Sequence, residues 1–303
     1  MQIQNHLEYF CLKVFCLFIR LAPLRLALWI GKALGVFAFS FLRIRKTVAI
    51  DNISSSFPEK SFPEVIKIAS NTYKIFGQNI IEFIRLPQMN HEYLEQKVTF
   101  VNESLLQQAF LTGKGTLCVS GHFGNWEIIA AAISAKGYPM IAVARDQRNP
   151  FANRMINEHR RAAGIETLQL GFALRGVLKS LRENKFVALL GDQDAHDEGT
   201  FIDFLGRPSS TAPGIAQFAL KTKAPIVFGA AVRGKNGHHT VYLRNIDHHD
   251  LEGITEENVK ILTQRHARAL EEFVREWPDH WFWLHKRWKT HAKARKQSDQ
   301  HVV

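Results

Sequence analysis

Residues 116–132 read TLCVSGHFGNWEIIAAA, and this stretch decides the fold. Residues 116–120 form an apolar run typical of a buried strand, and the polar motif GHFGNWE (residues 121–127) carries two glycines typical of a sharp turn. The Ile- and Ala-rich run that follows is typical of a helix. A strand that leads directly into a helix is the unit of a parallel sheet, in which sites usually lie at the carboxyl ends of the strands.

The same alternation continues along the chain. We predict strands at residues 116–120, 140–144, 165–170, 186–190, 225–232 and 240–243. We predict helices at residues 125–136, 150–163, 173–184, 211–221 and 256–276. A further helix is expected to begin at a capping box formed by Ser61 and Glu64, with Pro63 in its first turn, and to end at Arg85. These patterns predict an α/β fold with a mostly parallel sheet flanked by helices.

The N-terminal region is apolar but carries basic residues. Residues 9–42 are rich in Leu, Phe and Ile, contain four Lys or Arg, and are divided by Pro23. A clean membrane span takes about 20 apolar residues, whereas the stretch at residues 26–42 includes Lys32. We expect two helices, the second of which enters the bilayer or lies in its interface; the alternative is a buried helical hairpin. A cleaved signal peptide is disfavoured, and the basic run at residues 43–46 predicts that the following domain is cytoplasmic.

Composition limits the function classes. The chain has 303 residues, 46% of them hydrophobic, and a formal net charge of +11, so it can bury a large core and favours an acidic partner. Three cysteines give neither a disulfide framework nor a zinc pattern. We predict a membrane-associated segment (residues 1–46), one α/β domain (47–291) and a basic tail (292–303). Four tryptophans mixed with basic residues from Trp277 onward indicate a membrane-interface belt or a nucleic-acid surface, unless they pack in the core. Because the N-terminus is apolar, we favour anionic lipid over nucleic acid.

The GHFGNWE motif can hold a general base. Asn125 is expected to cap the helix that begins at Trp126, which places Glu127 in the first turn. We predict that Glu127 reaches the ring of His122, fixes its tautomer and leaves the other ring nitrogen free to accept a proton. Backbone N–H groups of the turn are expected to bind the oxyanion. The alternative is a well-capped helix with an incidental histidine.

Other candidates follow predicted strands. Arg145 is predicted to bind phosphate or orient a substrate, unless it is an ordinary surface arginine. Asp192 is expected to hold Arg145 or His122 in place, or to be purely structural. Thr211 to Gly214 describe a helix N-terminus, which attracts anions, and Arg207 adds positive charge nearby; an ordinary helix start has the same pattern. The pairs at residues 238–239 and 248–249 lack a ligand spacing, so we predict no metal site.

GHFGNWE is similar to the His-x4-Asp/Glu signature of glycerolipid acyltransferases, and its form resembles the bacterial lipid A late-acyltransferase family. The resemblance covers residues 10–291 in order. Further matching blocks are RIRKTVAIDNISSSFP (43–58), the Arg-then-Asn-Pro segment (145–150), GDQD (191–194), FLGRP with TAPG (204–214) and PDHWFWLHKRWKT (278–290).

The resemblance implies a glycerolipid-acyltransferase-like fold, an inner-membrane location and no cofactor. It implies transfer of an acyl chain from an acyl carrier protein thioester to a hydroxyl of a lipid A precursor. His122 and Glu127 would be catalytic, and Arg145, Asp192, Arg207, Thr211 and Gly214 would bind substrate. Alternatives are a different acceptor (a lysolipid, an amino-acid lipid or a glycolipid), a lipid hydrolase that uses the same residues, and a non-catalytic basic protein that binds membrane or nucleic acid.

Overall fold

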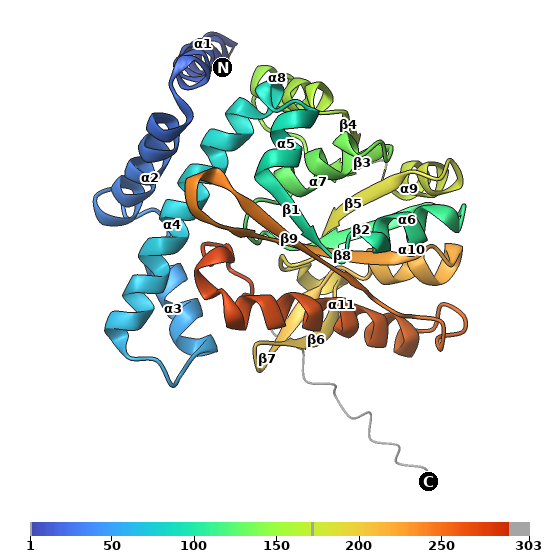
Figure 1. Ribbon diagram of the computed structural model, residues 1–303. Helices are drawn as coiled ribbons and strands as arrows, with labels where there is room; N and C mark the ends of the chain where they lie inside the picture. Colours follow the sequence, from blue (N-terminus) through green and yellow to red (C-terminus); the bar gives the residue numbers. More distant parts are fainter. Residues whose placement is uncertain (1, 171–172, 291–303) are drawn as a thin grey trace.

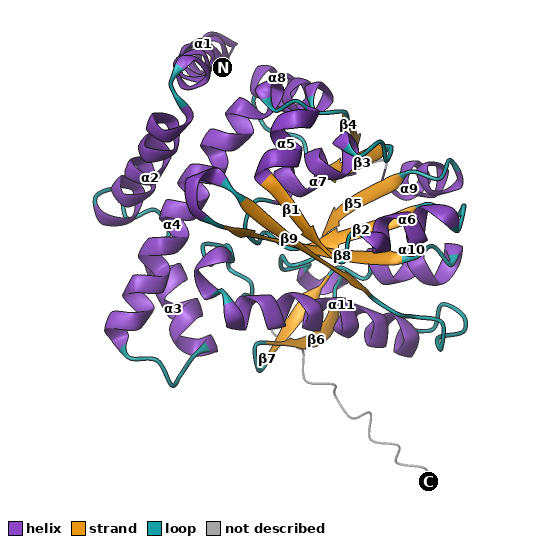
Figure 2. Cartoon of the chain, viewed as in Figure 1, coloured by secondary structure: helices purple, strands orange, loops and turns teal. Residues whose placement is uncertain are grey.

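Five parallel strands form most of a seven-stranded sheet in the computed structural model, which describes residues 2–170 and 173–290 (Figures 1 and 2). Across the sheet the strands are β1 (Val98–Val101), β9 (His239–Asn245), β8 (Ile226–Arg233), β2 (Thr116–Ser120), β5 (Phe186–Leu190), β3 (Met140–Ala144) and β4 (Ile165–Gln169). β8 and β9 pair antiparallel and β1 pairs parallel with β9. The two strands at one side of the sheet, β1 and β9, therefore run antiparallel to the other five. The predicted mostly parallel α/β fold is confirmed.

β2 lies between β5 and β8, near the centre of the sheet. Leu117 pairs with Val187 on one side and with Ile226 on the other, and all three side chains are buried. The strand is apolar along its length because both of its faces are buried. Because β2 is central, the turn that follows it lies at the middle of the sheet, at the carboxyl ends of the parallel strands. Side chains from several elements can meet there.

Helices cover both faces of the sheet. One face packs against α5 (His91–Lys97), α6 (Ser104–Leu111) and α7 (Trp126–Ala135), and the other against α9 (Ala173–Arg182), α10 (Gly214–Thr222) and α11 (Glu256–Glu276). α8 (Pro150–Ala162) follows β3 and contacts β4. The predicted helices all exist with ends within a few residues, and Ser61 donates from its N–H and its hydroxyl to the Glu64 carboxylate at the start of α4 (Phe62–Arg85).

Several short elements were not predicted. They are β1, α5, α6, α3 (Lys46–Ser56) and a two-stranded antiparallel hairpin of β6 (Thr200–Phe204) and β7 (Arg207–Thr211). β7 has the sequence RPSST, which gives no apolar signal, yet Ser209, Ser210 and Thr211 are fully buried. Their hydroxyls and carbonyls find partners inside the protein, and a polar strand can be buried when its groups are paired in this way.

The N-terminal helices pack along α4. α1 (Gln2–Leu21) and α2 (Leu24–Ser40) are separated at Pro23, as the sequence predicts, and α2 lies beside α4 (Figure 1). A methyl group on Gly35 would lie 2.1 Å from the carbonyl oxygen of Tyr73, so only glycine lets the two backbones come this close. The buried face of α2 consists of small or apolar residues, namely Ala27, Leu28, Gly31, Gly35 and Phe39.

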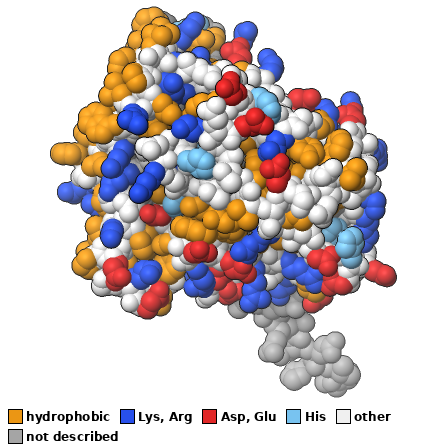
Figure 3. All heavy atoms as spheres, viewed as in Figure 1, with side chains coloured by type: hydrophobic (Ala, Val, Ile, Leu, Met, Phe, Trp, Pro, Cys, Tyr) orange, Lys and Arg blue, Asp and Glu red, His pale blue; other side chains and the backbone are white. Residues whose placement is uncertain are grey.

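The opposite faces of α1 and α2 expose large apolar side chains. Figure 3 shows hydrophobic side chains along the edge of the molecule that these helices form, with basic side chains among them. On α1 the spacing follows one helical stripe, and the exposed residues of both helices include Leu7, Phe10, Val14, Leu17, Phe18, Leu21, Leu26, Trp29, Leu34 and Phe37. Within the described residues, no helix is both long enough and apolar enough to cross a membrane.

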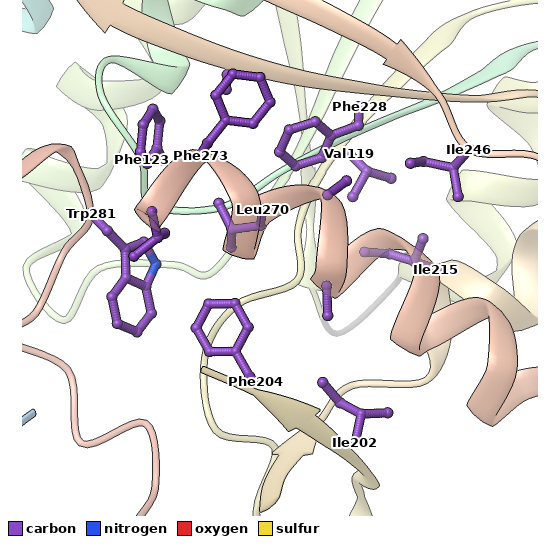
Figure 4. Close-up of a cluster of buried hydrophobic side chains, with 14 of the residues drawn as sticks. Val119, Phe123, Ile202, Phe204, Ile215, Phe228, Ile246, Leu270, Phe273 and Trp281 are labelled. Atoms are coloured by element: carbon purple, nitrogen blue, oxygen red, sulfur yellow. The ribbon is translucent and has the colours of Figure 1, made fainter. Parts of the chain in front are cut away.

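The C-terminal segment (residues 277–290) packs in the core. Trp281, Trp283 and Trp288 are buried, and Trp277 packs partly against the same cluster. Figure 4 shows Trp281 beside Phe123, Leu270 and Phe204, below the sheet and against α11. The predicted tryptophan belt at a membrane interface is therefore wrong for these residues, because the rings of Trp281, Trp283 and Trp288 pack in the core against one another and against Phe57 and Phe204. The predicted basic tail (292–303) lies outside the described residues, and the division into domains stays a prediction.

Candidate active site

The turn after β2 has one sterically required glycine. Gly124 has φ +53°, and a methyl group on it would lie 1.7 Å from the carbonyl oxygen of Ala231 in β8. Asn125 then caps α7, since its Oδ1 accepts from the backbone N–H of Ile128 at 3.2 Å. The predicted cap is confirmed, and the turn is held tightly against β8 with His122 on its outer side.

A carboxylate does hold the ring of His122, but it belongs to Asp192. Asp192 follows β5, and its Oδ1 lies 2.7 Å from Nδ1 of His122 while its Oδ2 accepts from the backbone N–H of His122 at 2.7 Å. This arrangement places the proton on Nδ1. It leaves Nε2, the other ring nitrogen, with a lone pair, and the side-chain amide nitrogen of Gln193 lies 3.4 Å from it.

The C-terminal segment binds the turn and Asp192 through hydrogen bonds. Trp281 donates from its indole Nε1 to Oδ2 of Asp192 at 2.8 Å, and the backbone N–H of Phe282 donates to the carbonyl of His122 at 2.9 Å. The backbone N–H of Gly124 donates to the carbonyl of His280 at 2.8 Å. Two N–H groups of the turn, those of His122 and Gly124, are therefore engaged within the protein, and the expectation that this turn supplies the oxyanion donors is wrong for these two groups.

The pKa values of Asp192 and His122 are both shifted from their ordinary values. Burial favours the protonated form of Asp192, but the neighbouring His122 and the hydrogen bonds from it and from Trp281 outweigh burial and lower the pKa of Asp192 to about 2. Burial likewise disfavours a charged His122 ring, but the charge of Asp192 and its hydrogen bond dominate, with a contribution from Glu127, so the pKa of His122 is raised. A proton taken up at Nε2 is therefore stabilised.

Glu127 binds Arg160 instead of the His122 ring. Arg160 of α8 donates from Nε to Oε2 of Glu127 at 3.1 Å and from Nη2 to Oε1 at 2.5 Å. Both side chains are largely buried. The expectation that Glu127 reaches the ring is thus not met in this structure, because the first turn of α7 directs Glu127 toward α8, where the guanidinium takes both of its oxygens.

His122 and Glu127 share one cavity of about 550 Å³. The wall combines apolar side chains of α4, such as Phe76 and Phe83, with polar groups at the ends of β3 and β5. Arg145 and Gln193 are among these polar groups, and both are exposed. The structure therefore brings together His122, Glu127 and Arg145, three of the residues that the sequence indicates, and places Asp192 directly behind His122.

A second, narrower space leads away from this cavity. It has a volume of about 70 Å³, lies between α7 and the sheet, and shares Trp126, Glu127 and Arg160 with the His122 cavity. Its other walls are almost entirely apolar, with Ile133, Met140, Ala188 and Leu243 among them. We call it the apolar pocket. The Glu127–Arg160 ion pair lies where the two spaces meet.

Three further candidates do not line the His122 cavity. The Arg207 guanidinium lies over the ring of Trp288, with 4.1 Å between its carbon and the ring centroid. Thr211 ends β7 and accepts a short hydrogen bond from Arg287, so it does not cap α10, which begins at Gly214 after Pro213. The predicted threonine cap is wrong because the hairpin extends through Thr211. The substrate-binding roles of Arg207, Thr211 and Gly214 stay predictions.

Sequence reasoning missed two residues that the site depends on. Arg160 lies in a run of basic residues at the end of α8, where nothing separates it from a solvated arginine until the partner is known. Trp281 was seen only as part of an aromatic and basic segment. No group of three His, Cys, Asp or Glu that could hold a metal ion occurs in residues 2–170 and 173–290.

Comparison with known proteins identifies the family of the chain. The family model described as bacterial lipid A biosynthesis acyltransferase matches residues 3–290. The chain belongs to this family.

Individual relatives are distant. A phosphatidylinositol mannoside acyltransferase of Mycobacterium tuberculosis (strain CDC 1551 / Oshkosh) is 27% identical over 56% of this chain and 55% of its own length, so the chain spans about half of that relative. A lipid A biosynthesis acyltransferase of Haemophilus influenzae is 22% identical over 70% of this chain and 67% of its own length. The lipid A biosynthesis palmitoleoyltransferase of Escherichia coli (strain K12) is 24% identical over 94% of this chain and 91% of its own length.

Proposed function

We propose that this protein is an enzyme that transfers a fatty acyl chain from an acyl carrier protein thioester to a hydroxyl of a lipid A precursor. Family membership supports the reaction class, and relatives named as lipid A biosynthesis acyltransferases support the acceptor. One observation carries the mechanism. The carboxylate of Asp192 holds Nδ1 of His122, which leaves Nε2 as a base beside the cavity.

The reaction needs a base and no protein nucleophile. Nε2 of His122 takes the proton of the acceptor hydroxyl while the hydroxyl oxygen forms a bond to the thioester carbonyl carbon. The carbon–sulfur bond then breaks, and the leaving thiolate takes the proton back from the imidazolium. Asp192 stabilises the imidazolium between these two steps, as the raised pKa of His122 reflects.

The negative charge on the carbonyl oxygen needs a donor inside the cavity. The backbone N–H groups of His122 and Gly124 already have partners. The side-chain amide nitrogen of Gln193 lies 3.4 Å from Nε2 of His122 and lines the same cavity. We therefore assign the oxyanion contact to Gln193.

The two spaces separate the two substrates. The apolar pocket accepts the acyl chain, because its walls offer almost no polar groups. Glu127 and Arg160 lie at its mouth and fix the chain's carbonyl end near His122, so we keep Glu127 in the site with this role. Arg145, exposed on the wall of the larger cavity, binds a phosphate of the acceptor.

The enzyme binds the cytoplasmic face of the inner membrane through the apolar faces of α1 and α2. Their exposed side chains form a continuous edge with Lys and Arg around it, which fits an interface of apolar chains and anionic headgroups. α4 connects this edge to the cavity, since it packs against α2 and contributes Phe76, Ile80 and Phe83 to the cavity wall. A lipid acceptor can then reach His122 from the membrane surface.

The test is mass spectrometry of products from purified protein in detergent. The protein is given a set of acyl carrier protein thioesters with a tetra-acylated lipid A precursor, or with a phosphatidylinositol mannoside as a second acceptor. His122→Ala and Asp192→Asn are assayed in parallel, with Arg182→Lys, an exposed residue at the end of α9 and outside the cavity, as a control. We expect the lipid A precursor to gain the mass of one acyl chain, and the gain to disappear in the first two variants only.

Other outcomes redirect the proposal. Transfer to the mannoside alone would move the acceptor to a glycolipid and keep the mechanism. Release of free fatty acid without transfer would indicate a hydrolase in which His122 activates water. Silence with every acceptor, for a folded protein, would remove the catalytic role of His122, and salt-sensitive DNA binding that His122→Ala leaves unchanged would favour the non-catalytic alternative.

A further inference from the structure

A second group of charged side chains is buried behind the active-site turn. Glu82 of α4 is 2% exposed, and its two carboxylate oxygens accept hydrogen bonds from two cationic or titratable side chains at the ends of neighbouring strands. Arg233 at the end of β8 donates to both oxygens, and His239 at the start of β9 donates from Nε2 to Oε1 at 3.2 Å. None of these three residues lines the His122 cavity.

This group is joined to the turn by two asparagines. Asn125 donates from Nδ2 to Oε2 of Glu82 at 2.6 Å while its Oδ1 caps α7. Asn79, almost one turn before Glu82 on α4, donates to the carbonyl of Gly124 at 2.6 Å and accepts from Arg233 at 2.8 Å. The last residues of the turn, Gly124 and Asn125, are thus bound to two side chains of α4, and Arg233 of β8 binds both of those side chains.

Burying these charged side chains costs desolvation free energy, and a contribution to stability is not enough to explain why they are there. Desolvation disfavours the carboxylate, but His239 and Arg233 outweigh it and lower the pKa of Glu82, so the group stays ionised. Buried ion pairs can often be replaced by apolar side chains of similar volume without loss of stability. What an apolar side chain cannot supply is a fixed acceptor that directs the Asn125 amide, and with it the path of the chain from His122 into α7.

We propose that Glu82 is a positioning residue for acyl transfer, which orients the turn carrying His122 by binding the side-chain amide of Asn125. The inference rests on the proposed function. Glu82 touches neither the substrate cavity nor the ring of His122. Its effect passes through Asn125 and Gly124, which lie three and two residues after His122, respectively.

The first test removes the Glu82 contact and keeps the helix cap. Asn125→Ser retains an oxygen that can cap α7 but has no amide to donate to Glu82. Asn90→Ser is the matched control, because Asn90 caps α5 in the same way, accepting from the backbone N–H of Tyr93 at 2.9 Å on the exposed surface. We expect Asn125→Ser to lower kcat about tenfold to hundredfold with KM changed less than about threefold, and Asn90→Ser to leave both unchanged.

The second test separates positioning from stability. In Glu82→Met and Arg233→Met each remaining charge is left buried without its partner, so both single variants should melt at lower temperature. The double variant Glu82→Met/Arg233→Met removes both charges and should recover most of the melting temperature. We expect its kcat to remain at least about tenfold below that of the unmodified protein, because Asn125 has still lost its acceptor. Recovery of kcat together with stability would overturn the proposal.

A readout without activity separates this inference from the proposed function. Hydrogen exchange of the backbone amides of residues 121–127 should be at least about tenfold faster in Asn125→Ser than in the unmodified protein and in Asn90→Ser. Faster exchange in Asn125→Ser, together with an unmodified protein that transfers no acyl chain, would defeat the proposed function and leave the positioning contact intact. Equal exchange and equal kcat in Asn125→Ser would defeat the positioning role even if acyl transfer is observed.

Discussion

Asp192 holds His122 at two points, its Oδ1 at the ring nitrogen Nδ1 and its Oδ2 at the backbone N–H, each at 2.7 Å. A carboxylate bound in this way fixes both the rotation of the ring and the position of the residue that carries it. The indole N–H of Trp281 also donates a hydrogen bond to Oδ2 of Asp192. The carboxylate therefore cannot turn away from the His122 ring without losing a buried hydrogen bond.

Asp192→Asn is predicted to retain the fold and lose most of the activity. The amide has nearly the same shape, but it removes the charge that stabilises the imidazolium and can offer its NH₂ to Nδ1, which would favour the wrong tautomer. We expect kcat to fall about 10²- to 10⁴-fold in the acyl-transfer assay. A fall of less than about threefold would show that Asp192 has only a structural role.

The activity is predicted to depend on pH through His122. The base must be neutral, and its pKa is raised by Asp192, so kcat/KM should be low below that pKa and rise with pH to a half-maximal point above 6.5, the ordinary pKa of histidine. In Asp192→Asn the residual activity should reach its half-maximal point at lower pH, because burial then acts on His122 without the opposing charge. A pH–rate profile of both proteins measures this shift, and a shift to higher pH would contradict the assignment.

Glu127 and Arg160 are predicted to depend on each other. Glu127→Gln leaves a largely buried guanidinium without its carboxylate and should lower the free energy of unfolding by about 1–3 kcal/mol. Arg160→Gln should cost a similar amount. The double variant should be less destabilised than the sum of the two by about 1 kcal/mol or more, as chemical denaturation of all four proteins would show. Strict additivity would mean that the pair contributes nothing as a pair.

Gly124→Ala is predicted to be among the most damaging single-methyl changes. The residue has a left-handed φ and its new methyl group would collide with the Ala231 carbonyl, so we expect a loss of about 3 kcal/mol or more and loss of activity. Gly113→Ala is the matched control. Gly113 has φ +68° and nothing within 4 Å of the added methyl group, so it should cost only about 1–2 kcal/mol in denaturation.

The apolar faces of α1 and α2 are predicted to bind anionic vesicles. Replacing Phe10, Phe18 and Trp29 together with serine removes exposed apolar area without touching the core, so binding in a sedimentation assay should fall at least about tenfold. A control variant with serine at Leu111 and Leu174, which are exposed elsewhere, should bind as before. Equal loss in both variants would indicate unspecific adsorption.

The fold could be predicted because each central strand is buried and is therefore a run of apolar residues. β2, β3 and β5 begin and end at the residues that the apolar runs indicate. The hairpin of β6 and β7 could not be predicted, because the buried residues of β7 are hydroxyl side chains whose partners come from distant segments. Arg287 supplies two of these contacts, to the carbonyl of Ser210 and the hydroxyl of Thr211, and neither follows from local spacing.

The candidate site shows the same division. His122 and the cap by Asn125 follow from the local pattern of the turn, since both depend on residues within a few positions. The partner of His122 does not, because Glu127 and Asp192 are both carboxylates and the shorter separation in sequence favours the wrong one. Only the pairing of β2 with β5 brings Asp192 to the ring, and that pairing is a property of the whole sheet.

The support of Asp192 by Trp281 sets an order on biosynthesis. The base, its carboxylate and the indole that holds the carboxylate lie at positions 122, 192 and 281, so the last of them leaves the ribosome after every strand of the sheet. A nascent chain that has already folded its parallel strands therefore still lacks the Trp281 hydrogen bond to Asp192. The Asp192–His122 pair reaches its final set of hydrogen bonds only when the C-terminal segment has been synthesised and has docked.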